Sequence, residues 1–300
     1  MKNKNFRSGF IAIIGKPNVG KSTFVNYVIG EKISIVSKTP QTTRFHVIGI
    51  KTTKNYQLIF ADTPGFHESK HLLGKKLIKY AKTQANEADI LIFMLDGSKS
   101  PDDMDFKVFS FLKLLKDKEK VYLVLNKIDK SNTESLKIVS DEFNREYKFK
   151  KTFFISAVTG ENIDLLEKEI ITQLSDTVKY FPDDMVTDKD IKTRISEIIR
   201  EKAIISTRHE IPHSIAVTVE TMREGNNKDI TYIEAIIYTE KDSQKKILIG
   251  KNGNLLKKIG TLSRASIQKL LNKKVFLDLR VKDKKDWRMR EDFLNTLGYE

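Results

Sequence analysis

The chain has 300 residues, of which 39% are hydrophobic and 31% charged, a composition that suits one large or two medium globular domains rather than a disordered protein. Its net charge of +14 favours a polyanionic partner such as nucleic acid or an anionic membrane surface. Because it has no cysteine, no secretory signal that we recognise and no apolar run long enough to span a membrane, we expect a cytoplasmic protein without disulfides or thiolate metal sites.

The first 175 residues alternate short apolar runs with amphipathic stretches. We expect buried strands at 9–15, 56–62, 89–96, 120–127 and 151–157, and helices at 73–87, 103–116, 133–147 and 162–174. This alternation predicts an α/β fold with a doubly wound, mostly parallel sheet. Residues 44–52 and 56–62 instead form a predicted hairpin, which adds one antiparallel strand at an edge of the sheet.

The pattern changes at residues 179–190, where Pro182 and an acidic cluster predict a linker between a first domain at 1–178 and a second at 191–300. The second domain shows a different order of elements: helix 190–207, strands 213–222 and 229–239, helix 243–249, helix 254–271, strand 274–282 and a last helix 286–297. Its grouped strands predict a small α+β domain. We expect its aromatic side chains, Trp287, Phe276 and Tyr238, to pack in the core or at the sheet edge rather than stack on bases.

Residues 15–22, GKPNVGKS, match the phosphate-loop pattern G-x-x-x-x-G-K-[ST] and lie between a predicted strand and a predicted helix. Backbone N–H groups of such a loop surround phosphates, and the N-terminus of the following helix adds a favourable field. We expect Lys21 to reach the β- and γ-phosphates and the Ser22 hydroxyl to ligate Mg²⁺. Farther on, DTPG at 62–65 follows a strand, so that Asp62 would hold Mg²⁺ through water and Gly65 would offer an N–H to the γ-phosphate.

The tetrad NKID at 126–129 indicates guanine as the base. The Asp129 carboxylate can accept hydrogen bonds from both donors of the guanine edge, N1–H and N2–H₂, which adenine lacks; we expect roughly a hundredfold preference. Asn126 would brace the neighbouring loop, Lys127 would lie over the ring, and SAVTG at 156–160 would supply the Ala157 N–H to guanine O6. We therefore assign these residues to nucleotide binding: Gly15, Lys16, Pro17, Asn18, Val19, Gly20, Lys21, Ser22, Thr23, Asp62, Thr63, Pro64, Gly65, Asn126, Lys127, Asp129, Ser156, Ala157 and Val158.

With all these motifs in order, residues 9–175 resemble a translation-factor-type GTPase domain. The segment 38–50, KTPQTTRFHVIGI, is similar to switch I of the Era GTPases, and this switch would include Gln41, Thr42, Thr43, Arg44 and Phe45. The resemblance implies that Thr43 is a further protein ligand of Mg²⁺, beside Ser22 and the water-mediated Asp62. It also implies a catalytic set made of Lys21, Asn18, Thr43 and Gly65.

Phe66 stands where Ras-like GTPases have the glutamine that orients the attacking water. A phenyl ring cannot orient water, so a partner, the backbone or metal ions must serve instead. In several families related to Era, the asparagine at the position of Asn18 helps to hold K⁺ against the phosphates. The alternative, in which Asn18 only forms the turn beside Pro17, stays open, and so does the use of K⁺.

A second glycine turn, GKNG at 250–253, is not another phosphate loop, because it lacks the Lys-Ser/Thr pair and a preceding parallel strand. A Gly-x-x-Gly turn between two helices lets an RNA backbone approach closely, as in the clamp of KH modules, which holds about four nucleotides. Residues 241–290 contain 16 Lys and Arg but 4 Asp and Glu, a net charge of +12. We assign to RNA binding the residues of the turn and the cations that follow it: Gly250, Lys251, Asn252, Gly253, Lys257, Lys258 and Arg264.

The element order of 190–282 resembles the type II KH domain that ends Era proteins, so the resemblance covers nearly the whole chain. It implies a monomeric GTPase that binds GTP and GDP with Mg²⁺, contacts small-subunit (16S) rRNA and assists assembly of the small ribosomal subunit. Weak peripheral contact with the inner face of the cell membrane is also part of that expectation. Two alternatives stay open: a membrane-surface regulatory GTPase whose basic C-terminal domain binds anionic lipid, and a phosphate-loop small-molecule kinase, which would have no use for NKID.

Overall fold

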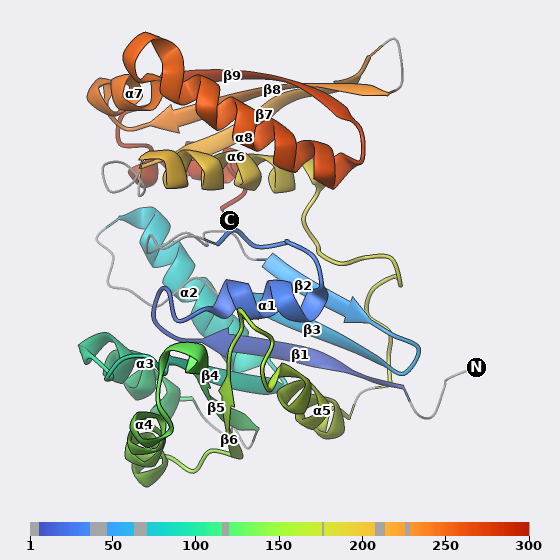
Figure 1. The fold of residues 1–300 in the computed structure, drawn as a ribbon, viewed down its shortest axis with the longest axis vertical. Helices are drawn as coiled ribbons and strands as arrows, with labels where there is room; N and C mark the ends of the chain where they lie inside the picture. Colours follow the sequence, from blue (N-terminus) through green and yellow to red (C-terminus); the bar gives the residue numbers. More distant parts are fainter. Residues whose placement is uncertain are drawn as a thin grey trace. The chain divides into compact units, whose positions relative to one another are not determined.

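A computed structural model of the chain describes residues 6–36, 47–62, 71–115, 120–175, 177–207, 214–225 and 229–299. The chain forms two compact units, the first containing most residues up to Asp188 and the second made mainly of the residues from Lys189 onward. Figure 1 labels their helices and strands. None of the helices in the described ranges is both long and apolar enough to cross a membrane.

The first unit is built on a six-stranded sheet with the strand order β2-β3-β1-β4-β5-β6. Its strands are β1 (Arg7–Ile14), β2 (Val47–Thr52), β3 (Tyr56–Asp62), β4 (Ile90–Asp96), β5 (Val121–Asn126) and β6 (Lys151–Ile155). All neighbours pair in parallel except β2 and β3, which are antiparallel. This confirms the predicted doubly wound sheet with an antiparallel hairpin at one edge.

Helices cover both faces of this sheet. They are α1 (Lys21–Ile29), α2 (Leu72–Glu87), α3 (Asp103–Lys113), α4 (Thr133–Glu146) and α5 (Ile163–Gln173), with a short 3₁₀ turn η1 (Ile128–Lys130). Ala85, Val108 and Phe143, from α2, α3 and α4, share one apolar cluster with Phe93 of β4. On the other face, Phe24 of α1 packs edge-on against a phenylalanine of β3 with ring centroids 5.7 Å apart. Because both faces are covered, strands such as β4 are buried at every position.

Residues 179–188, part of the predicted linker, are bonded to the first unit. The buried Gln57 side chain of β3 donates to the Phe181 carbonyl (2.9 Å) and accepts from the Tyr180 N–H (2.8 Å). Farther on, Ile50 N–H donates to the Val186 carbonyl (2.9 Å), and Ile48 N–H to the Asp188 carboxylate (3.1 Å). The segment therefore runs along the outer edge of β2 and occupies its hydrogen-bonding groups.

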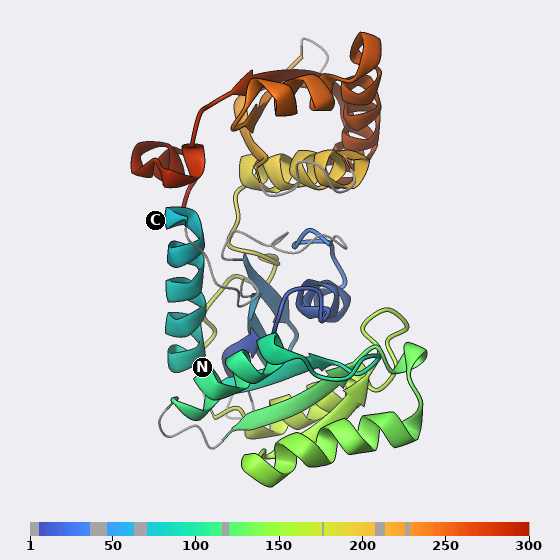
Figure 2. The same cartoon turned by 90° about the vertical axis from the view of Figure 1, so that its left-hand side faces the viewer.

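The second unit has a three-stranded sheet in the order β7-β8-β9, with β7 and β8 antiparallel and β8 and β9 parallel. Its elements are α6 (Ile191–Thr207), β7 (Ala216–Glu224), β8 (Ile230–Thr239), α7 (Asp242–Ile249), the 3₁₀ turn η2 (Lys251–Gly253), α8 (Asn254–Leu271) and β9 (Lys274–Asp283). The helices α6, α7 and α8 pack on one face of the sheet (Figure 2). Along α8, Ile259, Ser263 and Ile267 recur every fourth residue and form its buried stripe.

The end of the chain differs from the predicted helix 286–297. It forms the 3₁₀ turn η3 (Trp287–Met289) and then α9 (Glu291–Thr296), with Arg290 extended between them (φ −98°, ψ 108°). The Trp287 side chain is fully buried, and its indole N–H donates to the Ser214 carbonyl at 2.9 Å. The helix is interrupted on both sides of Trp287, by Asp286 in the left-handed region (φ 50°) and by the extended Arg290.

Candidate nucleotide and RNA sites

The phosphate loop connects β1 to α1, and two of its positions require glycine. A Cβ on Gly15 would lie 2.4 Å from the Met94 carbonyl oxygen of β4, too close for any side chain. Gly20 has a φ of 106°, and a Cβ there would lie 2.1 Å from the Asn126 side-chain nitrogen. The loop is therefore in tight contact with the ends of two neighbouring strands.

Lys21 lies inside the curve of this loop. Its side chain is buried, and Nζ donates to the carbonyls of Gly15 and Lys16, at 2.9 Å each. The ammonium is thus held at the centre of the ring of backbone groups, the place where a phosphate-binding lysine is needed. Ser22 follows at the N-terminus of α1, with its N–H groups and helix dipole directed at the same place.

Asn126 joins the base-recognition segments to the phosphate loop. Its side chain is buried at the end of β5; Nδ2 donates to the Val19 carbonyl (2.8 Å), and Oδ1 accepts from the Ala157 N–H (2.9 Å). Asp129 lies in the exposed turn η1, and its carboxylate accepts the Ser156 hydroxyl at 2.6 Å. The structure thus brings residues 126–129 and 156–158 together beside the loop, as guanine binding requires.

Lys127 makes a second connection to the loop, through a partner that the sequence analysis did not identify. Its Nζ donates to the Asn18 carbonyl (2.7 Å) and to the Asp96 carboxylate at the end of β4 (2.6 Å). Ser98 donates its N–H (3.1 Å) and hydroxyl (2.6 Å) to the other oxygen of Asp96. Burial alone would raise the pKa of Asp96, but the hydrogen bonds from Lys127 and Ser98 hold it below its ordinary value. The sequence signal that could have identified Asp96 is an acidic residue at the carboxyl end of a predicted parallel strand.

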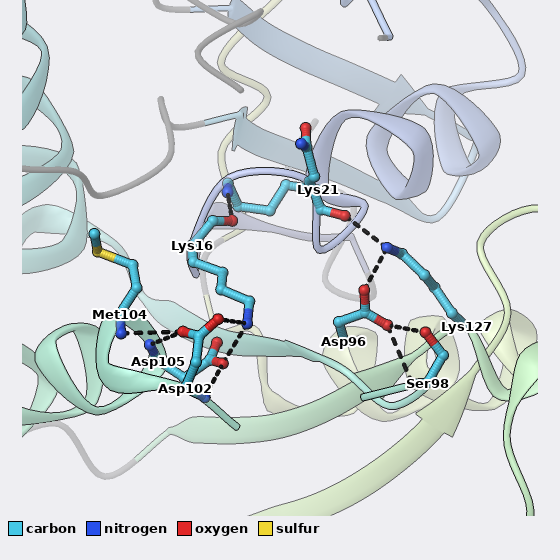
Figure 3. Close-up of polar contacts among 9 residues, drawn as sticks. Lys16, Lys21, Asp96, Ser98, Asp102, Met104, Asp105 and Lys127 are labelled. Carbon is cyan, nitrogen blue, oxygen red and sulfur yellow. Dashed lines mark hydrogen bonds and ion pairs between the residues drawn. The ribbon is translucent and has the colours of Figure 1, made fainter. Parts of the chain in front are cut away.

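Lys16 anchors the other side of the loop to α3. Its Nζ contacts the carboxylates of Asp102 (2.8 Å) and Asp105 (2.5 Å), which also form the capping box at the start of α3 (Figure 3). Burial raises the pKa of Asp105 although Lys16 opposes this, whereas the hydrogen bond from Lys16 lowers the pKa of the more exposed Asp102. Sequence analysis missed this tether because the two partners are 86 and 89 residues from Lys16.

Several predicted site residues lie outside the described part of the chain: Gln41, Thr42, Thr43, Arg44, Phe45, Thr63, Pro64 and Gly65. Asp62 is described only in its backbone, which ends β3 opposite Ile13 of β1 in the parallel register. This register brings the Asp62 backbone to the carboxyl edge of the sheet, where the phosphate loop after β1 leads into the first turn of α1 with Ser22. A hydroxyl and a carboxylate at this edge are hard oxygen donors, which fit Mg²⁺.

The second glycine turn, between α7 and α8, has positive φ values at three of its four residues. These are Gly250 (φ 72°), Asn252 (φ 53°) and Gly253 (φ 76°). A Cβ on Gly250 would lie 2.7 Å from that of Leu255, whereas one on Gly253 would meet nothing within 4 Å. The space above Gly253 is therefore open to an approaching backbone, as an RNA clamp requires.

Cationic side chains surround this turn. Lys251 is exposed in the turn itself, and Lys257, Lys258 and Arg264 are exposed along α8. Because they are seven residues apart, Lys257 and Arg264 lie on the same face of the helix. Four exposed cations therefore lie on α8 and the turn before it, and two of them share one face of the helix.

The doubly wound sheet with its phosphate loop and guanine-type segments, together with the helix–GxxG–helix unit, defines a GTPase domain followed by a type II KH domain. A family profile described as "50S ribosome-binding GTPase" matches residues 10–127, and one described as "KH domain" matches residues 210–288. GTPase Era of Clostridium botulinum (strain Eklund 17B) is 44% identical over 297 residues, covering 98% of this chain and 99% of the relative. This chain belongs to the Era family of GTPases, and it hydrolyses GTP.

Other relatives agree over the full length. GTPase Era of Alkaliphilus oremlandii is 45% identical over 295 residues, covering 98% of this chain and 99% of its own. A solved structure of Era in complex with MgGDPNP and nucleotides 1506–1542 of 16S ribosomal RNA matches with a TM-score of 0.94 at 38% identity, covering 98% of this chain and 99% of that one. An Era variant of Aquifex aeolicus bound to GDP and AlF₄⁻ matches with a TM-score of 0.93, also at 38% identity and with the same coverage. The predicted fold class is confirmed.

Proposed function

We propose that this GTPase binds the 16S rRNA of the small ribosomal subunit through its KH domain and assists assembly of that subunit. The observation that carries the proposal is the open turn at 250–253, whose positive φ values and empty space above Gly253 suit a clamp on an RNA backbone. The net charge of +12 over residues 241–290 supplies attraction for a polyanion. The related Era structure, which contains 16S rRNA nucleotides, identifies the class of RNA.

At the GTP site, each described residue has a distinct task in this proposal. Lys21 neutralises charge on the β- and γ-phosphates from within the loop, while Asn126 and Lys127 hold the loop in a fixed position against the base-binding turn. Asp129 recognises guanine, and Ala157 offers its N–H to the O6 atom. Mg²⁺, when bound by Ser22 and the predicted Thr43 and Asp62, supplies further charge neutralisation for the leaving phosphates.

K⁺ at the phosphates is a separate part of the proposal. Asn18 has a left-handed backbone (φ 67°), and its carbonyl is already engaged by Lys127, so its side chain extends from a fixed point of the loop. We expect GTP turnover to be several-fold faster in K⁺ than in Na⁺ buffer, and Asn18→Ala to abolish the difference. Equal rates in the two buffers would assign Asn18 to the turn alone.

The RNA part is tested by nucleotide-dependent chemical footprinting of small ribosomal subunits with the full chain. We expect protection of 16S rRNA by the wild type, and its loss in Lys251→Asp/Asn252→Asp, which places two carboxylates in the turn. Lys168→Asp/Asn55→Asp makes the same charge change at exposed positions of the GTPase domain and should leave the footprint intact. An unchanged footprint in the turn variant would refute the clamp assignment.

The same variants test the proposed weak contact with a membrane surface. Flotation with vesicles rich in anionic lipid, without RNA, measures this contact directly. If the turn variant keeps its RNA footprint but loses vesicle binding, Lys251 and Asn252 contact the membrane surface rather than the rRNA.

A further inference from the structure

The face of the KH sheet opposite its helices carries a row of one cation and two aromatic rings. The strand register places Arg223 of β7 beside Tyr232 of β8, and Tyr232 beside Phe276 of β9. The Arg223 guanidinium carbon lies 5.6 Å from the centre of the Tyr232 ring, and the Tyr232 and Phe276 ring centroids are 5.4 Å apart. The row therefore crosses all three strands without interruption.

Phe276 lies on β9, an edge strand of the sheet, where the sequence analysis expects an aromatic side chain to pack. Its neighbours Val275 and Leu277 point into the cluster beneath the helices, while the Phe276 side chain is 57% exposed. Its ring contact with Tyr232 is tilted, with an interplanar angle of 42°, and more than half of the side chain is open to solvent. An exposed phenylalanine beside a tyrosine that itself carries an arginine is a suitable stacking surface for nucleobases.

The charges around the row favour a polyanion. On β9, strand alternation places Lys274, Arg280 and Lys282 on the same face as Phe276, and all three are exposed. Among the described residues, the carboxylates on this face are those of Glu220, Glu234 and Asp278, and Asp278 is already paired with Arg280 at 2.9 Å. With Arg223 added, this face carries four cations and three carboxylates, a net positive charge.

The position of the row connects it to the proposed clamp. Helix α8 starts at the glycine turn and ends at Leu271, and β9 begins three residues later. The 18 residues of α8 span about 27 Å. The row thus lies about one helix length from residues 250–253, at the other end of the same domain.

We propose that Arg223, Tyr232 and Phe276 form a second RNA-contacting surface, the aromatic row, on which unpaired bases of the RNA held at the glycine turn stack. This inference rests on the proposed function, because the clamp brings the RNA to the domain. The clamp holds the backbone and is indifferent to the bases beyond about four nucleotides, whereas the aromatic row binds base faces. The aromatic row contributes to RNA affinity only when the RNA is long enough to extend from the glycine turn to the row.

The test measures affinity of the full chain for 16S rRNA nucleotides 1506–1542 and for fragments shortened from either end. We expect Phe276→Ala to weaken binding of the long RNA about tenfold, which is the scale of one lost stacking contact. The loss should disappear below a defined fragment length. Phe276→Tyr should restore binding. Met289→Ala removes a comparably exposed apolar side chain (54%) from the same domain and should change nothing.

Two further measurements separate stacking from charge and from folding. RNA with abasic sites keeps its phosphates, so it should bind wild type and Phe276→Ala equally. Phe276→Trp adds an exposed indole, and its fluorescence should be quenched by RNA, while the buried Trp287 gives a constant background. If Phe276→Ala binds every RNA like the wild type while Lys251→Asp/Asn252→Asp loses binding, the aromatic row is refuted and the proposed function stands. If the turn variant also binds normally, the proposed function itself fails.

Discussion

Replacing Lys16 with methionine should destabilise the GTPase domain in a pH-dependent way. The substitution leaves the Asp105 carboxyl, whose side chain is 3% exposed, without its cation. Removing one partner of a buried ion pair costs about 3–5 kcal/mol when the other charge stays ionised. Asp105 can instead take up a proton, which sets a ceiling of about 1.4 kcal/mol for each pH unit above the ordinary pKa of 3.8.

This ceiling gives the expected magnitudes. At pH 7 it is about 4 kcal/mol, so we expect a loss of about 2–4 kcal/mol; at pH 5 the loss cannot exceed about 2 kcal/mol. The sign follows from the pKa of the folded variant, which is raised above the unfolded value. A group of this kind favours folding at low pH and loses that contribution as the pH rises, so the deficit grows from pH 5 to pH 7.

The assay is urea denaturation followed by far-UV circular dichroism at both pH values, with hydrogen exchange of the phosphate-loop amides as a local probe. Lys16→Arg should be near neutral, and adding Asp105→Asn to Lys16→Met should recover stability. Lys113→Met breaks an exposed pair with Glu146 and should cost below about 1 kcal/mol at either pH. A Lys16→Met deficit that is the same at pH 5 and pH 7, or no larger than that of Lys113→Met, would refute the tether.

Three further outcomes are expected. Asp129→Asn should lower GTP affinity roughly a hundredfold and favour xanthosine triphosphate in a competition assay, and an unchanged guanine preference would contradict the assignment. Asp96→Asn should weaken GDP binding about tenfold by releasing Lys127. Because the pKa of Asp96 is lowered in the fold, its contribution to stability is present above its ordinary pKa and is lost as the pH falls through the lowered value. Acid unfolding of the wild type and of Asp96→Asn will measure this contribution. Gly253→Ala should cost about 1–2 kcal/mol in thermal denaturation, since φ is 76° although the space is empty; a neutral effect would show that the turn relaxes.

The fold and the nucleotide motifs could be predicted because their signals are local. A phosphate loop is contiguous and lies between a strand and a helix, and the carboxyl ends of parallel strands must meet at one edge, which places Asn126 near residue 15 without any knowledge of side-chain packing. The element order of the KH domain follows in the same way from periodicity and glycine positions.

Pairings across the fold could not be predicted. The contacts of Lys16 with Asp105 and of Lys127 with Asp96 depend on how α3 and β4 are set against the loop, and lysines and carboxylates are too frequent in this chain for their partners to be chosen from the sequence. Alternation along β9 separates Phe276 from Val275 but does not say which face the helices cover. The last helix was predicted as continuous because the contact of Trp287 with Ser214, 73 residues earlier in the chain, leaves no local signal.

The segment 186–188 along β2 determines where a stable GTPase fragment of this chain can end. A GTPase fragment ending at residue 178 would uncover the edge of β2 and leave the N–H groups of Ile48 and Ile50 without their acceptors. It would also leave the buried Gln57 amide without Tyr180 and Phe181. Such a fragment would present an open strand to other copies of itself and aggregate, whereas one ending at Asp188 keeps its edge closed.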